Sequence, residues 1–145
     1  MIVIADSNLV ISSLYAPKNI IASIFKSEKN IQLIAPDFIL DEINNHFTEI
    51  VDKTRKSKSE LQFELKQIVG RIKFIPAEEI PMIHIKKAIA IVWDIDIDDT
   101  LFVALHLFKK HKIWTGDKVL INGLKSKGYD ICVTTTELKT KMYKK

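Results

Sequence analysis

The 145-residue sequence has very little cysteine, with Cys132 as the single example. One cysteine excludes an intramolecular disulfide and an all-cysteine zinc site, so a reducing, cytoplasmic setting is expected. Glycine and proline are also scarce, at four residues each, which excludes collagen-like and low-complexity chains. No apolar run approaches the roughly 20 residues of a membrane span, and Asp6 interrupts the apolar start. We therefore expect a soluble protein without a membrane partner.

The composition is that of a globular chain, with 47% hydrophobic and 28% charged residues. The length suits one domain covering residues 1–145 and allows a sizeable hydrophobic core. The formal net charge of +4 favours a polyanionic partner without identifying it.

Short apolar runs alternate with segments of helical periodicity, which predicts an α/β domain with a mostly parallel sheet. The Lys/Arg-rich segment 53–58 is expected to be a turn. Strands are expected at 2–5, 31–35, 72–75, 112–115 and 129–133, and helices at 9–14, 20–25, 38–50, 61–72, 79–92, 100–108, 120–124 and 134–145.

Acidic residues follow two of the expected strands. Asp6 comes directly after strand 2–5, and Asp117 follows strand 112–115. Ligands of parallel α/β sheets bind beyond the carboxyl ends of the strands, so these two acids can meet in space. Glu42 lies beside the apolar face of helix 38–50 and can reach the edge of the same pocket.

Three stretches carry a family resemblance: residues 2–8 (IVIADSN), 96–105 (DIDDTLFVAL) and 113–118 (IWTGDK). In this order and at these distances they resemble the PIN-domain nucleases over essentially the whole chain. The resemblance implies a three-layer α/β/α sandwich with a central, mostly parallel sheet. It also implies catalytic and metal-binding roles for four acids, and site-ordering roles for two polar residues: Asp6, Glu42, Asp99 and Asp117, then Asn8 and Thr115.

The chain departs from the family pattern at two positions. Leu101 stands where a proline is common, and Val119 stands where many relatives have a further acid. Neither change replaces one of the four principal acids, but loss of a fifth acid is expected to weaken metal affinity.

Elementary electrostatics supports a cation at such a cluster. Carboxylates held together in a partly desolvated pocket repel one another, unless they take up protons or bind a cation. Mg²⁺ or Mn²⁺ fits a site of carboxylates, waters and substrate phosphate. A bound ion of this kind activates water for attack on a phosphodiester, and a carboxylate oxygen left free can act as general base. Taken with the resemblance, which implies a nuclease, this chemistry makes a metal-dependent endoribonuclease the expected function.

The resemblance implies RNA as the substrate, and the strongly basic charge of the chain without its four site acids agrees with a nucleic-acid backbone as partner. The resemblance also fits the toxin of a toxin–antitoxin pair, with an antitoxin protein as partner, although free-standing RNA-processing enzymes look the same. Homodimers are common among small nucleases of this kind. The expected phosphate contacts are Lys53, Arg55, Lys56, Lys58, Arg71 and Lys118.

Several residues near these positions also have simpler interpretations. Asp94, Asp96 and Asp98 fit solvated acids or helix caps, and the position of Asp98 beside Asp99 leaves its role open. His46 lies four residues after Glu42, but a structural or substrate-side role is favoured because no HExxH motif accompanies it. Trp114 is expected in the core.

The sequence fits three other functions less well. An aspartyl phosphatase normally has a second acid two residues after the first, where this chain has Asn8. A receiver domain would show paired acids near the first strand and a lysine after the last strand, and neither is clear. A catalytically inactive module for RNA binding or protein interaction is disfavoured by the presence of all four acids.

Overall fold

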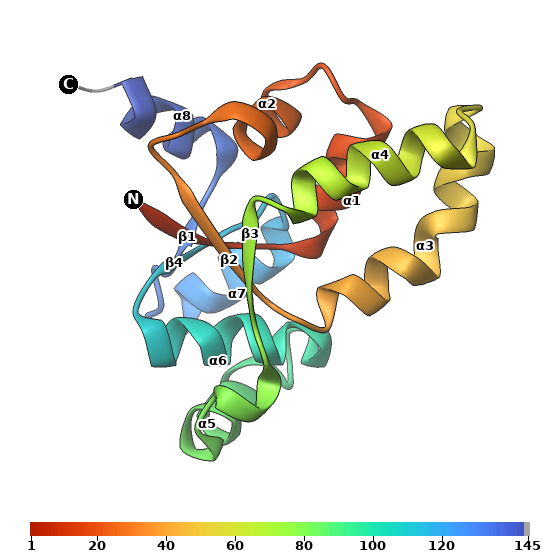
Figure 1. The fold of residues 1–145 in the computed structure, drawn as a ribbon. Coiled ribbons are helices and arrows are strands. Elements are labelled where there is room, and N and C mark those ends of the chain that lie inside the picture. The colour runs from red at the N-terminus through yellow and green to blue at the C-terminus, as the bar shows by residue number, and fades with distance from the viewer. Residues whose placement is uncertain (144–145) are drawn as a thin grey trace.

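A five-stranded sheet forms the centre of the computed structural model, which describes residues 1–143 (Figure 1). All neighbouring strands are parallel, in the order β3-β2-β1-β4-β5. The sheet is thus fully parallel, and the predicted α/β class is confirmed. The strands are β1 (Ile2–Ala5), β2 (Gln32–Pro36), β3 (Ile72–Ile75), β4 (Lys112–Trp114) and β5 (Cys132–Val133).

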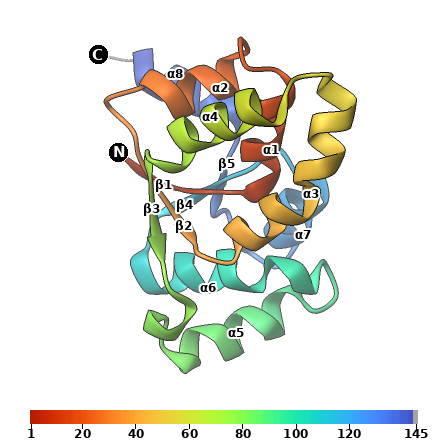
Figure 2. The ribbon, with the colours of Figure 1, turned by 45° about the vertical axis from the view of Figure 1, so that its right-hand side comes forward.

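Helices cover both faces of the sheet and complete the three-layer sandwich (Figures 1 and 2). One layer holds α1 (Ser7–Tyr15), α2 (Ile20–Ser27), α4 (Lys58–Val69) and α8 (Thr135–Tyr143), with α3 (Ile39–Thr54) packed against α1. The other layer holds α6 (Thr100–Lys109) and α7 (Lys118–Ser126), and α5 (Met82–Val92) packs on α6. Two 3₁₀ turns complete the chain, η1 (Ala77–Glu79) and η2 (Ile97–Asp99).

The core joins the sheet to both layers. Trp114 on β4 is fully buried, and its ring centroid lies 5.0 Å from that of Phe25 on α2. Its indole Nε1 donates a hydrogen bond to Thr135 Oγ1 at the start of α8, 3.0 Å away. The core role predicted for Trp114 is confirmed, whereas Trp93 is 69% exposed at the end of α5.

Several element boundaries differ from the sequence prediction. Helix α3 continues through Thr54, so the basic turn is shorter than 53–58 and begins at Arg55, whose φ of 58° ends the helix. The expected helix 79–92 is two elements, because Pro81 occupies the N-cap of α5. Strand β5 begins only at Cys132, since the Tyr129 N–H bonds Leu124 O at the end of α7. Residues 144–145 of the last expected helix lie outside the described residues.

The order of the strands defines the position at which a ligand site is expected. The chain builds β1, β2 and β3 outward and then returns to place β4 on the other side of β1. Ligand sites of open parallel sheets lie at such a reversal, beyond the carboxyl ends of the strands. The carboxyl ends of β1 and β4 are therefore where a site is expected.

No helix within residues 1–143 has both the length and the hydrophobicity that crossing a bilayer requires.

Candidate active site

Asp6 and Thr115 meet at the carboxyl ends of β1 and β4. The two strands pair in parallel with Ala5 opposite Trp114, and the ladder continues through a bond from Asp6 N to Trp114 O. Thr115 Oγ1 donates to Asp6 Oδ2 at 2.7 Å, and both side chains are buried. Burial raises the pKa of Asp6, while the Thr115 hydroxyl and the Asn8 N–H act to lower it. The neighbouring charge of Asp117 raises this pKa further.

Asp99 is held without the hydrogen bonds that its position normally provides. It occupies the N-cap of α6, where an aspartate usually accepts a bond from a backbone N–H of the first turn, yet no such bond forms. Its Oδ2 is buried and has no partner among the described residues. Burial, followed by the charges of Asp6, Asp96, Asp117 and Asp98, raises the pKa of Asp99 to about 7.

Glu42 reaches the same region from the first turn of α3, because only Asp37 and Phe38 separate β2 from this helix. Ser7 Oγ, on the first residue of α1, donates to Glu42 Oε2 at 3.2 Å. Partial burial raises the pKa of Glu42, the Ser7 bond lowers it, and the charges of Asp6 and Asp98 raise it.

Asp117 is the N-cap of α7, and its Oδ1 accepts bonds from Val119 N and Leu120 N. The Asp117 N–H in turn donates to Thr115 Oγ1, which links this acid to the Asp6 bond. The four acids predicted from the sequence are thus brought to one place by four different strand-to-helix and turn-to-helix connections.

A single cavity of about 150 Å³ collects these side chains. Within it the structure places the four predicted acids, Asn8, and residues to which no site role was assigned, including Ser7. Asp98, left open by the sequence, also lines this cavity, and Asp96 does so while its Oδ1 caps η2 by accepting from Asp98 N. The lining residues are Asp6, Ser7, Asn8, Glu42, Asp96, Asp98, Asp99, Phe102 and Asp117.

The donor set fits a divalent cation that prefers oxygen. Within residues 1–143, no group of three or more His, Cys, Asp or Glu side chains is already gathered closely enough to hold a metal ion. The buried Oδ2 of Asp99 has no partner among the described residues. Burial first, and neighbouring acids after it, raise the pKa values of Asp6, Glu42 and Asp99, so a nearby cation would favour their ionised forms. Mg²⁺ or Mn²⁺ supplies that positive charge and accepts such ligands, so the residues present fit this group.

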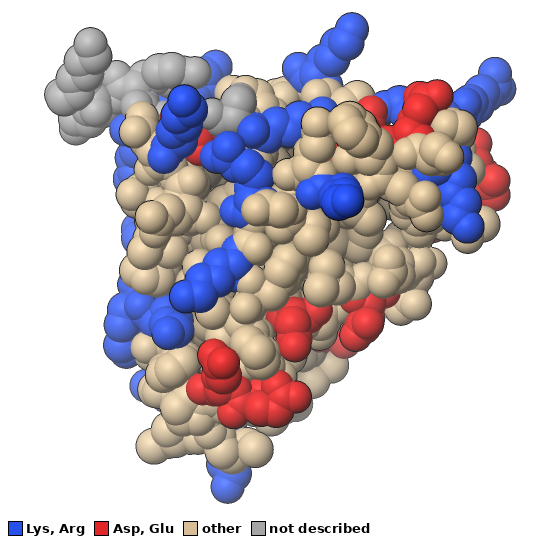
Figure 3. Space-filling view, in the orientation of Figure 1, with Lys and Arg blue, Asp and Glu red and all other residues tan. Residues whose placement is uncertain are grey.

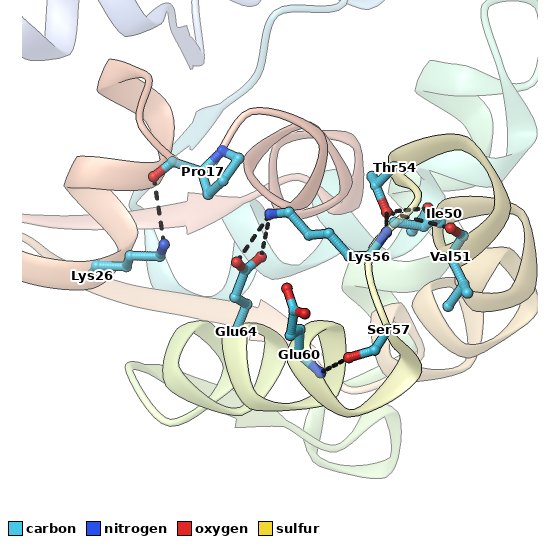
Figure 4. A network of polar contacts seen from close by, with 9 residues as sticks. All are labelled: Pro17, Lys26, Ile50, Val51, Thr54, Lys56, Ser57, Glu60 and Glu64. Carbon is cyan, nitrogen blue, oxygen red and sulfur yellow. Dashed lines mark hydrogen bonds and ion pairs between the residues drawn. The ribbon is translucent and has the colours of Figure 1, made fainter.

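The structure corrects one of the six expected phosphate contacts and gives a second one an ion-pair partner. Arg71 precedes β3, at the opposite end of the sheet, and its guanidinium donates to Lys26 O and Glu28 O at the end of α2. The ammonium of Lys56 lies 3.0 Å from Glu64 Oε1, so its charge is already matched (Figure 4). Neither of these cations lines the carboxylate cavity.

The remaining cations differ in their distance from the acids. Lys118 is exposed in the first turn of α7, immediately after Asp117. Lys53 lies three turns along α3 from Glu42, roughly 16 Å at 1.5 Å per residue, and it pairs with Glu49. Arg55 and Lys58 belong to the same distant end of α3 and start of α4. Lys118 is thus the cation best placed to meet substrate at the cavity.

Charge is unevenly distributed on the face seen in Figure 3. Basic side chains spread over its upper and left parts, acidic ones gather in its lower half, and both signs mix at the upper right.

His46 is exposed and lies 3.4 Å from Glu49 Oε2, on the solvent side of α3. This placement is consistent with the structural or substrate-side interpretation and gives His46 no place in the cavity lining.

Comparison with known proteins gives one family match. A family model described as PIN domain matches residues 4–142, nearly the whole chain. The comparison with curated proteins gives no match.

Proposed function

Because the chain belongs to the PIN-domain family, whose members are generally nucleases, we propose that it is a metal-dependent endoribonuclease. The observation that carries the proposal is the Asp99 carboxylate, which is buried in a cavity of acids with one oxygen unpartnered. A group of this kind is costly to the fold unless a cation compensates it. The energetic cost of burying the Asp99 carboxylate is explained if this residue binds the cation that performs the reaction.

The residues divide into ligands and the groups that orient them. Asp6, Asp99 and Asp117, with Glu42 at the rim, would hold Mg²⁺ or Mn²⁺. When bound, the ion lowers the pKa of water and offsets negative charge on a phosphodiester. The Thr115 hydroxyl fixes Asp6, and the Ser7 hydroxyl fixes Glu42. Hydrogen-bond partners of this type restrict the rotation of a ligating carboxylate.

Glu42 suits the role of proton acceptor. Its pKa is raised by partial burial, which brings its basicity closer to neutral pH than that of a solvated glutamate. Glu42 would hold the ion through the oxygen that is bonded to Ser7, which leaves its other oxygen to take a proton from water. Lys118 would pair with a substrate phosphate beside the cavity.

Incubation of unstructured single-stranded RNA with the protein and Mn²⁺ tests the proposal. Cleavage is expected with Mn²⁺ and is expected to disappear with a chelator or in Asp6→Asn and Asp99→Asn. Asp52→Asn, an exposed acid further along α3, serves as the matched control and should cleave normally. Cleavage that resists chelation would contradict the mechanism. RNA binding that is unchanged in Asp6→Asn and Asp117→Asn, without cleavage by any form, would favour the inactive module.

A toxin role is proposed only on the family resemblance and needs its own test. Induced expression of the wild-type chain in bacterial cells should arrest growth, and Asp6→Asn should relieve the arrest. Normal growth under wild-type expression would favour RNA processing instead.

A further inference from the structure

A second, larger hollow adjoins the carboxylate cavity. It has a volume of about 460 Å³ and lies between the start of α3 and the η2–α6 turn. This size is within the range of small-molecule sites. Half of its lining side chains are apolar, and Ile97 is 52% exposed at its edge. The lining residues are Phe38, Glu42, Ile97, Asp98, Thr100 and Leu101.

The two hollows lie next to each other. Glu42 and Asp98 line both of them. The ring of Phe38 in the larger hollow contacts the ring of Phe102 in the carboxylate cavity edge-on, with centroids 5.3 Å apart. A nucleotide whose phosphate lies at the acids therefore has this apolar hollow within reach of its base.

The polar groups of the larger hollow are hydrogen-bond acceptors. The carboxylates of Glu42 and Asp98 carry no proton to donate when ionised. The Thr100 hydroxyl already donates to Ile97 O at 2.6 Å, so only its lone pairs remain for a ligand. Among the residues that the structure describes, no Lys or Arg lines the hollow, which disfavours a phosphate there. Its occupant should be a flat, largely apolar group with donors along one edge.

Guanine matches this description better than the other bases. Its Watson–Crick edge presents the neighbouring N1–H and N2–H donors, which can pair with both oxygens of one carboxylate. Guanine also carries O6 on that edge, but no other base has two adjacent donors there. Uracil has its single N3–H between two carbonyl oxygens, and the amino groups of cytosine and adenine each lie beside an acceptor nitrogen. Aromatic contacts and Watson–Crick edge bonds are the usual means by which proteins recognise unpaired RNA bases.

We propose that this hollow binds the guanine base of a nucleotide next to the scissile phosphate, with Asp98 on its Watson–Crick edge and Phe38 and Leu101 against its ring. The proposal rests on the proposed nuclease function and deepens it. Asp98 is thereby a specificity-determining residue.

Cleavage of unstructured oligoribonucleotides that contain a single guanosine, or adenosine in its place, tests the specificity. Wild-type protein with Mn²⁺ should cut beside guanosine about tenfold faster, in keeping with the discrimination expected of a paired contact to a base edge. Asp98→Asn should reduce this preference to less than about threefold, and Phe38→Ala should raise KM with little change in kcat. Asp41→Asn, an exposed neighbour on α3 outside both hollows, should retain the preference.

Nucleoside binding separates the failure of this proposal from failure of the nuclease function. Guanosine should shift the methyl NMR signals of Ile97 and Leu101 in metal-free protein, and adenosine, uridine and cytidine should shift them far less. Guanosine binding without any RNA cleavage would support the hollow while contradicting the nuclease proposal. Cleavage without base preference, a preference for another base, or no guanosine shift would overturn the guanine assignment, and circular dichroism would verify that the variants are folded.

Discussion

The Thr115 hydroxyl donates to Asp6 Oδ2 at 2.7 Å and joins the carboxyl ends of two neighbouring strands at the proposed site. Both residues are buried, and the same Thr115 oxygen accepts the Asp117 N–H. One hydroxyl thus positions two of the acids to which the family resemblance assigns catalysis.

Replacement of this hydroxyl should affect stability and activity together. Thr115→Val keeps the shape but leaves Asp6 Oδ2 and Asp117 N without their partner, at an expected cost of about 1 to 3 kcal/mol in the free energy of unfolding. Urea denaturation measures this loss, and Thr115→Ser should recover most of the stability and cleavage. Equal activity in Thr115→Val and wild type would show that the bond does not position Asp6.

The pKa of Asp99, raised from 3.8 to about 7, predicts a pH dependence of stability. The folded state favours the protonated carboxyl, so stability should fall as the pH rises from about 4 to about 7 and change little above that. Without divalent ions, Asp99→Asn should therefore be more stable than wild type at pH 8, by about 2 kcal/mol after allowance for screening by nearby water.

Thermal unfolding from pH 4 to pH 8 measures this difference, which should disappear at the acidic end. Asp52→Asn provides the control because that acid is exposed on α3. An Asp99→Asn protein that is less stable than wild type at pH 8 would show that the ionised carboxylate has a partner.

Divalent ions should stabilise the wild-type fold. A ligand at one hundred times its Kd adds about 2.7 kcal/mol to the free energy of unfolding. A rise in Tm with Mn²⁺ is expected for wild type and not for Asp6→Asn or Asp99→Asn. The rise in Tm caused by Mn²⁺ should become smaller below pH 7, because protons compete with the ion for the Asp99 carboxylate. Equal rises in Tm for all these proteins would place the ion elsewhere.

Ser7 should act through Glu42. Removal of the hydroxyl in Ser7→Ala frees the Glu42 carboxylate and is expected to lower Mn²⁺ affinity and cleavage about tenfold, as for other groups that orient metal ligands. Ser12→Ala on the same helix is the matched control, since Ser12 does not line the cavity. Mn²⁺ titration and initial cleavage rates report the two quantities, and identical values for both variants would remove Ser7 from the site.

Lys118 should contribute to RNA binding by charge alone. Lys118→Ala is expected to weaken the affinity for RNA. It should also reduce, by about one, the slope of the logarithm of the RNA-binding constant plotted against the logarithm of the salt concentration. Lys56→Met should leave the slope unchanged, because Lys56 is paired with Glu64 (Figure 4). Filter binding to single-stranded RNA at several salt concentrations provides the measurement. A larger effect from Lys56→Met would place the RNA along the end of α3.

The sequence predicts that the acids converge at one edge of the sheet because two simple rules act together. Apolar periodicity locates β1 and β4, and parallel pairing brings the acids that follow them to one edge, as Asp6 and Asp117 show. The same reasoning places Arg71 at the far end of the sheet, since it precedes a strand instead of following one. Only the charge of Arg71 favours phosphate binding.

Other features depend on geometry that periodicity does not contain. The Ser7–Glu42 bond joins side chains from α1 and α3, and its distance follows from how these helices pack. The Lys56–Glu64 pair requires the left-handed turn at Arg55. That Asp99 fails to cap α6 cannot be read from sequence, because an aspartate at that position is normally a cap.

The most direct test of the central claim is the anomalous scattering of crystals soaked in Mn²⁺ at a concentration that supports RNA cleavage. A peak bonded to Asp99 Oδ2 and to carboxylate oxygens of Asp6 and Asp117 is predicted, and it should be absent in Asp99→Asn. A cleaving protein with no peak in this cavity would contradict the account.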